Sequence, residues 1–127
     1  MALFSADSIV ICYANVEAAK VWWTEVFDCK PSNVPADWDE PLPSDVVLKL
    51  PGHDEPIIVL IDRAEVQRAG LALPTDRPIL FCGKIKRAHE YLEGRGASPG
   101  PIQDGGGTQF FEVRDPEGNV IEVCKEP

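Results

Sequence analysis

This sequence of 127 residues lacks three features that would each indicate a particular class of protein. It has no apolar run approaching the roughly 20 residues that a membrane-spanning helix needs, so we expect no membrane partner. Its first residues, Met1 to Asp7, lack the basic region and the long apolar stretch of a secretory signal, and we therefore expect a cytoplasmic protein. It also lacks an excess of basic residues: the net charge is -9, which argues against a nucleic-acid partner. The acidic charge either serves solubility or attracts a cationic small molecule.

Patterns that form disulfides or bind metals are equally scarce. No Cys-x-x-Cys pair is present, and we expect reduced, mostly buried thiols. The four cysteines are Cys12, Cys29, Cys82 and Cys124. The two histidines, His53 in a predicted turn and His89 on a predicted helix, have no neighbour at ligand spacing. We expect neither to bind a metal and His89 to face solvent. The glycine-rich run Asp104–Thr108 precedes a strand, whereas a phosphate cradle needs a helix N-terminus, so no cofactor is predicted.

The residues that are present predict one globular domain made of two related halves. A hydrophobic content of 44% with 26% charged residues is ordinary for such a domain. In the first half, a strand at Ser8–Tyr13 precedes an amphipathic helix with Asn15 as its N-cap. The apolar stripe of that helix is Val16, Ala19, Trp23, Val26 and Phe27. In the second half, a strand at Pro78–Cys82 precedes a helix marked by Ile85, Ala88 and Leu92.

Each half then closes with a strand pair, and the two halves superpose with Ser8 on Arg77. The strand pairs are Val46–Leu50 with Pro56–Ile61, and Thr108–Val113 with Val120–Cys124. Ala64–Leu73 is either a short helix or a linker, and the proline-rich Pro31–Ser44 is a loop with a short extended piece. The sequence therefore predicts a duplicated strand–helix–hairpin unit.

The last hairpin is the most informative segment. Asp115-Pro116-Glu117-Gly118-Asn119 has the composition of a tight turn, and both flanks are rich in β-branched and aromatic residues. Glu122 places a carboxylate inside the second, otherwise apolar strand. This segment resembles the closing hairpin of the vicinal oxygen chelate superfamily, which includes glyoxalase I, extradiol dioxygenases, fosfomycin-modifying enzymes and bleomycin-resistance proteins. A second match covers Ser8 to Lys30, including Val21–Phe27.

The resemblance implies an α+β fold in which two βαβββ modules, about 6–63 and 75–126 of a single 1–127 domain, form a curved mixed sheet around a ligand cleft. It also implies homodimerisation. Metal-dependent relatives bind their ion at four strand positions, which correspond here to Ser8, a residue near Val59, Arg77 and Glu122. Three of these four cannot serve as expected ligands, and an arginine would repel a cation. We therefore expect no metal.

The chain is closest in character to the acidic, metal-free bleomycin-resistance-type members, which bind a drug and catalyse no reaction. A protein that binds a small ligand, cationic or aromatic, is favoured. The alternative is a lyase, isomerase or dioxygenase-type enzyme that uses Glu122 as a general base or metal ligand.

Strand alternation then selects the residues that face the cleft. The ligand-binding residues expected are Ser8, Val10, Trp38, Arg77, Ile79, Phe81, Phe111 and Glu122. On the strand around Gln109–Val113, the sequence agrees equally with Gln109, Phe111 and Val113 facing the cleft and with the alternate residues facing it. Trp38 either stacks on the ligand or packs down on the domain. Glu122 either pairs with Arg77, with their charged groups within about 6 Å, or reaches water in an open cleft.

Overall fold

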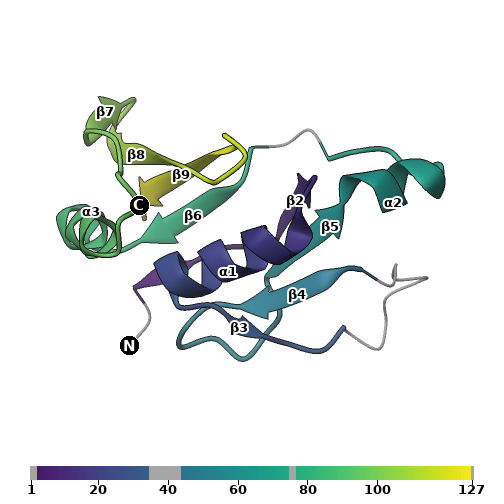
Figure 1. Ribbon diagram of the computed structural model, residues 1–127. Coiled ribbons are helices and arrows are strands. Elements are labelled where there is room, and N and C mark those ends of the chain that lie inside the picture. Colours follow the sequence, from purple (N-terminus) through teal and green to yellow (C-terminus); the bar gives the residue numbers. More distant parts are fainter. Residues whose placement is uncertain (1–2, 35–43, 75–76, 127) are drawn as a thin grey trace.

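The computed structural model describes residues 3–34, 44–74 and 77–126, which form two mixed sheets and three helices (Figure 1). Each sheet has one face packed against a helix, and the two sheet–helix units lie side by side in the ribbon view. In the part of the chain that is described, no helix has both the length and the apolar character needed to cross a membrane. The predicted α+β fold class is therefore confirmed.

The first sheet has the strand order β2-β5-β4-β3. These strands span, in that order, Ile9–Tyr13, Ile58–Asp62, Val46–Lys49 and Lys30–Pro31. β2 runs parallel to β5, and the other pairs are antiparallel. Helix α1 (Val16–Phe27) packs against β2 and β5, and helix α2 (Arg63–Arg68) follows β5. The segment predicted as helix or linker is thus a short helix followed by an irregular connection.

The second sheet repeats this arrangement with the order β6-β9-β8-β7. Its strands span, in that order, Ile79–Cys82, Val120–Lys125, Thr108–Arg114 and Gln103–Gly105, and helix α3 covers Ile85–Gly94. β6 runs parallel to β9, as β2 does to β5. Both halves therefore have the same βαβββ topology. Each half forms its own mixed sheet, which agrees with the predicted pair of βαβββ modules.

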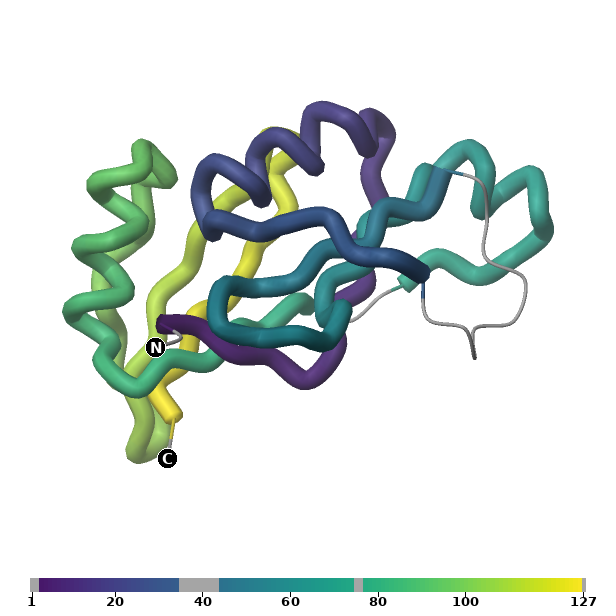
Figure 2. The backbone as a smooth tube through the Cα atoms, turned by 90° about the horizontal axis from the view of Figure 1, so that it is seen from below, coloured from purple at the N-terminus to yellow at the C-terminus, as the bar shows by residue number. Residues whose placement is uncertain are grey.

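A two-residue strand that the sequence did not reveal connects the halves. β1 (Phe4–Ser5) pairs antiparallel with β6, so the beginning of the chain extends the sheet of the second half. The Ser5 hydroxyl donates a hydrogen bond to Glu126, 3.1 Å away. Figures 1 and 2 accordingly show the purple β1 segment on the same side of the molecule as the yellow end of β9.

Helix α1 begins at the N-cap that its sequence predicts. The Asn15 side chain accepts a hydrogen bond from Ala18 N at 3.1 Å, which satisfies one of the free amides of the first turn. The helix ends at Asp28, whose φ of 54° lies in the left-handed region. The apolar stripe is buried throughout, and Trp23 donates an indole hydrogen bond to the Tyr13 hydroxyl at 3.0 Å.

The buried core is continuous across both halves. Phe4 of β1 makes an edge contact with Phe27 of α1, with ring centroids 5.2 Å apart, and another with Tyr91 of α3 at 5.9 Å. The Glu117 carboxylate, in the turn between β8 and β9, accepts hydrogen bonds from Ala14 N at 2.8 Å and from Asn15 N at 2.9 Å. The two halves are therefore held together by packing and by backbone hydrogen bonds.

Candidate functional site

The β6, β9 and β8 strands present one face to α3 and leave the other face open. The residues turned toward α3 are fully or almost fully buried: Leu80, Phe111, Val113, Ile121 and Val123. The alternate residues are partly exposed: Ile79, Phe81, Phe110, Glu112, Glu122 and Cys124. This alternation places Glu122 and Cys124 on one face of the last strand.

The larger of two adjoining cavities, about 540 Å³, lies where β2 of the first half approaches β6 of the second. The connection after α2 contributes Ala72, Leu73 and Pro74 to its wall. The structure brings five of the expected ligand-binding residues together there: Ser8, Val10, Arg77, Ile79 and Phe81. Ser8 and Arg77, which occupy equivalent positions in the two halves, thus line the same cavity. Its wall is mainly apolar, and Val10 and Ile79 remain 41% and 38% exposed.

The second cavity, about 410 Å³, shares part of its wall with the first. The shared residues are Val10, Leu73, Pro74, Arg77 and Pro78. Cys12 lines only the second cavity, and so does Val120. Arg77 is the charged residue among those that line both cavities.

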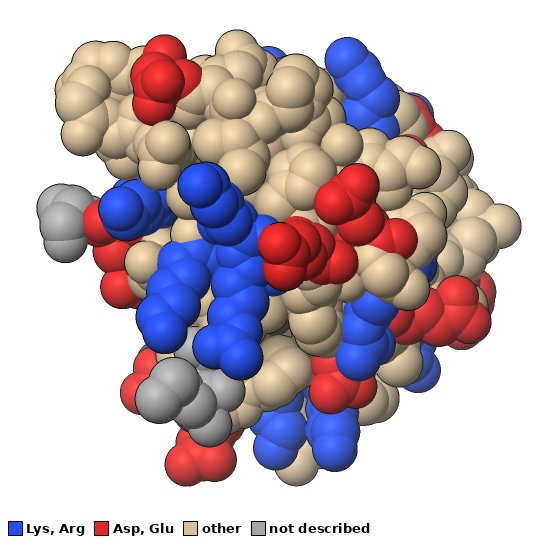
Figure 3. Space-filling model, turned by 90° about the vertical axis from the view of Figure 1, so that its left-hand side faces the viewer, with Lys and Arg blue, Asp and Glu red and all other residues tan. Residues whose placement is uncertain are grey.

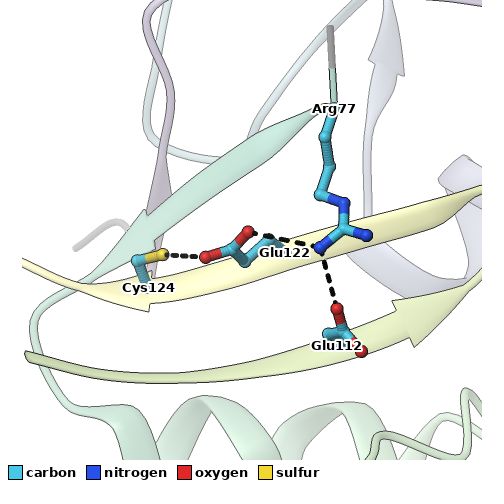
Figure 4. Close-up of polar contacts among 4 residues, drawn as sticks. All are labelled: Arg77, Glu112, Glu122 and Cys124. Carbon is cyan, nitrogen blue, oxygen red and sulfur yellow. Dashed lines mark hydrogen bonds and ion pairs between the residues drawn. The ribbon is translucent and has the colours of Figure 1, made fainter. Parts of the chain in front are cut away.

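Arg77 also joins two carboxylates on the open face of the sheet (Figure 4). Its Nη1 donates a hydrogen bond to Glu112 Oε2 at 2.9 Å and lies 3.7 Å from Glu122 Oε2. The hypothesised pair of Arg77 and Glu122 is confirmed, since these charged groups are within 6 Å. The sequence did not single out Glu112, although Glu112 and Glu122 are directly opposite each other across the hairpin. Glu112 and Glu122 lie five residues before and five residues after Glu117, which is in the middle of the turn. This symmetric spacing would have identified them as opposing residues of the hairpin.

The other oxygen of Glu122 is also engaged. Cys124 Sγ donates a hydrogen bond to Glu122 Oε1 at 3.2 Å (Figure 4). Burial of the thiol, together with its hydrogen bond to the carboxylate, raises the pKa of Cys124 to about 12. The thiol therefore stays protonated near neutral pH, and Cys124 is not an activated nucleophile.

Phe111 is not at the cleft, which corrects its assignment as a ligand-binding residue. Its side chain has no exposed surface and packs in the core on the α3 side of the sheet. His89 of α3 is likewise not turned to solvent as expected. Its ring contacts Phe111 edge-on at 5.0 Å between centroids, and Nε2 hydrogen-bonds to Gly100 O at 2.8 Å. The open-face aromatic residue on β8 is Phe110 instead.

Glu122, also expected at the ligand site, does not line either cavity. Trp38 lies outside the described residues. His53, in the turn between β4 and β5, hydrogen-bonds through Nε2 to Phe4 O at 2.9 Å and so contacts β1.

The residues at the four metal-ligand positions do not fit a divalent cation. Arg77 places a guanidinium next to Glu122, and Val59 offers only hydrocarbon. Nowhere in residues 3–34, 44–74 and 77–126 do three or more His, Cys, Asp or Glu side chains converge to hold a metal ion.

Charge is unevenly distributed over the surface despite the net value of -9. Figure 3 shows the side of the molecule that is at the left in Figure 1, where basic side chains gather in one cluster. Lys84, Lys86 and Arg87 are exposed around the start of α3, and Lys125 is in register with the end of β6. None of these residues lines the two cavities. The charged residues that line the two cavities are instead Asp7, Arg63 and Arg77.

Comparison with known proteins supports the same fold. No protein-family model and no curated protein matches the chain. A glyoxalase/bleomycin resistance protein/dioxygenase superfamily member from Sphaerobacter thermophilus superposes with a TM-score of 0.71 at 18% identity, over 96% of this chain and 97% of its own. A lactoylglutathione lyase from Agrobacterium tumefaciens gives 0.70 at 18% identity, over 95% and 93%. An integron cassette protein from the Halifax Harbour sewage outfall gives 0.71 at 15% identity, over 96% and 98%.

These structures establish the fold. The chain has the fold of the glyoxalase/bleomycin resistance/dioxygenase superfamily, and the resemblance inferred from its sequence is confirmed at that level.

Proposed function

We propose that this protein binds a small ligand with an apolar or aromatic body and a cationic group in the cavity between β2 and β6, without a metal and without catalysis. The observation that supports this most directly is the composition of the cavity wall. Apolar side chains from both halves line it, and Arg77 at its edge contacts two carboxylates. Apolar surfaces with a few placed polar groups are typical of small-molecule sites.

The alternative is an enzyme in which Glu122 acts as a general base. A base needs a carboxylate oxygen free to reach the substrate proton. Here one oxygen of Glu122 faces Arg77 and the other accepts the Cys124 thiol hydrogen bond. The engaged state of both oxygens favours binding over proton abstraction.

We also propose a homodimer. Large apolar side chains around the cavity remain exposed, and a second copy would cover them as the resemblance implies. These residues are Val10, Leu71, Leu73 and Ile79. Sedimentation velocity tests this part of the proposal, and a monomer at concentrations up to about 100 μM would contradict it.

The ligand proposal is tested with cationic aromatic compounds such as benzamidine and their neutral isosteres. We expect Ile79→Ser, in the cavity wall, to weaken binding at least about tenfold. Val21→Ser is the matched control, because Val21 is 54% exposed on α1 and does not line the cavity. Equal binding by both variants would place the ligand elsewhere. One tightly bound metal per purified chain would contradict the metal-free part.

A further inference from the structure

We propose that Glu112 and Glu122 form a cation subsite, that Arg77 fills it in the ligand-free protein, and that the cationic group of a ligand enters by displacing the Arg77 guanidinium. This inference rests on the proposed function and specifies the chemical class of the ligand's cationic group. The group recognised would be a planar cation of the amidinium or guanidinium type, since the subsite already accommodates such a group.

The subsite is built into the backbone of the last hairpin. Glu112 and Glu122 are paired residues of β8 and β9, and both side chains lie on the open face of the sheet. Like charges directly opposite each other destabilise a strand pair. The register of the hairpin keeps the two residues opposite each other when Arg77 moves away, so a cation that bridges their carboxylates reduces the repulsion between them.

Arg77 is a weakly held occupant of this subsite. One nitrogen, Nη1, makes both contacts, and within the described residues Arg77 has no other hydrogen bond or ion pair. The paired-fork geometry that makes arginine–carboxylate contacts strong is therefore not used. The Arg77 side chain is 51% exposed, against 35% for Glu112 and 22% for Glu122. Exposed ion pairs contribute little to stability, and the more exposed partner is the one that can leave.

The position of Arg77 connects the subsite to the cavities. Arg77 lines both the 540 Å³ and the 410 Å³ cavity, so displacing its guanidinium from the glutamates changes the wall of both. Ile79, in the wall of the larger cavity, is the strand partner of Glu122. Adjacent strands are about 4.8 Å apart, so an aromatic ring packed on Ile79 lies within reach of the carboxylates for an attached cation.

The subsite itself is tested without a full ligand by chemical complementation. In Arg77→Ala, millimolar methylguanidinium should shift the amide resonances of Glu112, Glu122 and Cys124 in ¹⁵N NMR spectra, whereas neutral methylurea should not. The double variant Arg77→Ala/Glu112→Gln should lose at least about 80% of that response, because one carboxylate is gone. Equal responses of the single and double variants would overturn the subsite. So would the absence of any response in folded Arg77→Ala.

Displacement is tested by calorimetry with benzamidine and benzamide. We expect Arg77→Ala to bind benzamidine about tenfold more tightly than the wild-type protein, with benzamide affinity unchanged within about twofold. Tighter binding of both compounds would mean only a larger cavity and would overturn displacement, and so would weaker benzamidine binding by Arg77→Ala. In either case benzamidine still binds and the proposed function stands. If neither protein binds benzamidine while methylguanidinium complements Arg77→Ala, the proposed function fails and the subsite remains.

Discussion

Glu117 caps the helix that begins after Asn15, although 102 residues separate them: Glu117 Oε2 accepts the Asn15 backbone N–H at 2.9 Å. The other carboxylate oxygen accepts Ala14 N. A negative charge at this end also complements the dipole of α1. The turn between β8 and β9 therefore stabilises the first helix of the chain as well as its own hairpin.

Glu117→Ala should lower the free energy of unfolding by about 1 kcal/mol, because two backbone donors lose a charged acceptor. Glu90→Ala is the control, since Glu90 is exposed on α3 and makes no hydrogen bond or ion pair within the described residues. Urea unfolding measures both. A Glu117→Ala protein as stable as Glu90→Ala would show that the cap contributes nothing in solution.

Tyr13→Phe should cost about 1–3 kcal/mol, because the buried indole N–H of Trp23 then has no acceptor. The cost should be accompanied by a change in tryptophan fluorescence in the folded state. Tyr91→Phe serves as the matched variant: within the described residues no hydrogen bond involves the Tyr91 hydroxyl. Equal losses in the two variants would contradict this account.

Phe111→Ala and Phe81→Ala should separate stability from binding. Phe111 is fully buried, and its truncation should cost about 3–5 kcal/mol. Phe81 is partly exposed in the cavity wall, so Phe81→Ala should cost less than half as much and weaken benzamidine binding. A Phe111→Ala protein that is stable but defective in benzamidine binding would show that Phe111 belongs to the ligand site after all.

Stability should fall as the solution becomes alkaline. A thiol in an unfolded chain has a pKa near 8.5, whereas burial raises the pKa of Cys29 and Cys124 to about 12 and that of Cys82 to about 11. The folded chain therefore retains protons that the unfolded chain releases. The associated stability is fully present below about pH 8 and declines from there toward pH 11–12.

For the fully buried Cys29 this loss is about 2 kcal/mol between pH 8 and pH 10. Urea unfolding at both pH values measures it. Cys29→Ala should show a shallower decline, because one of the shifted thiols is gone. An unchanged slope would assign the pH dependence to other groups.

The duplicated pattern of strand and helix was enough to predict much of the fold and part of the site. Placing Ser8 on Arg77 by helix spacing alone identified two residues that line one cavity. The turn was predictable for a similar reason: the buried Asp115 carboxylate accepts Glu117 N and Asn119 N, and Gly118 takes a φ of 80°. These features depend on local chemistry, which sequence displays directly.

The features that sequence did not reveal depend on tertiary contacts. Phe110 and Phe111 are both apolar, so composition does not say which faces α3, and only the register of the hairpin decides. His89 lies beside the apolar stripe of α3, and its burial comes from Gly100 and Phe111, outside that helix. Strand β1 is too short to show a hydrophobic pattern in the sequence, and it forms only because it pairs with β6.

The pairing of β1 with β6 has a consequence for the order in which the chain is built. A ribosome makes Phe4 and Ser5 more than 70 residues before Phe81 and Cys82, at about 5–20 residues per second. Throughout that interval the aromatic ring of Phe4 lacks its contact with Tyr91 of α3. We therefore expect nascent chains that stop after Asp62 to expose Phe4 to protease, and chains that extend through Lys125 to protect it.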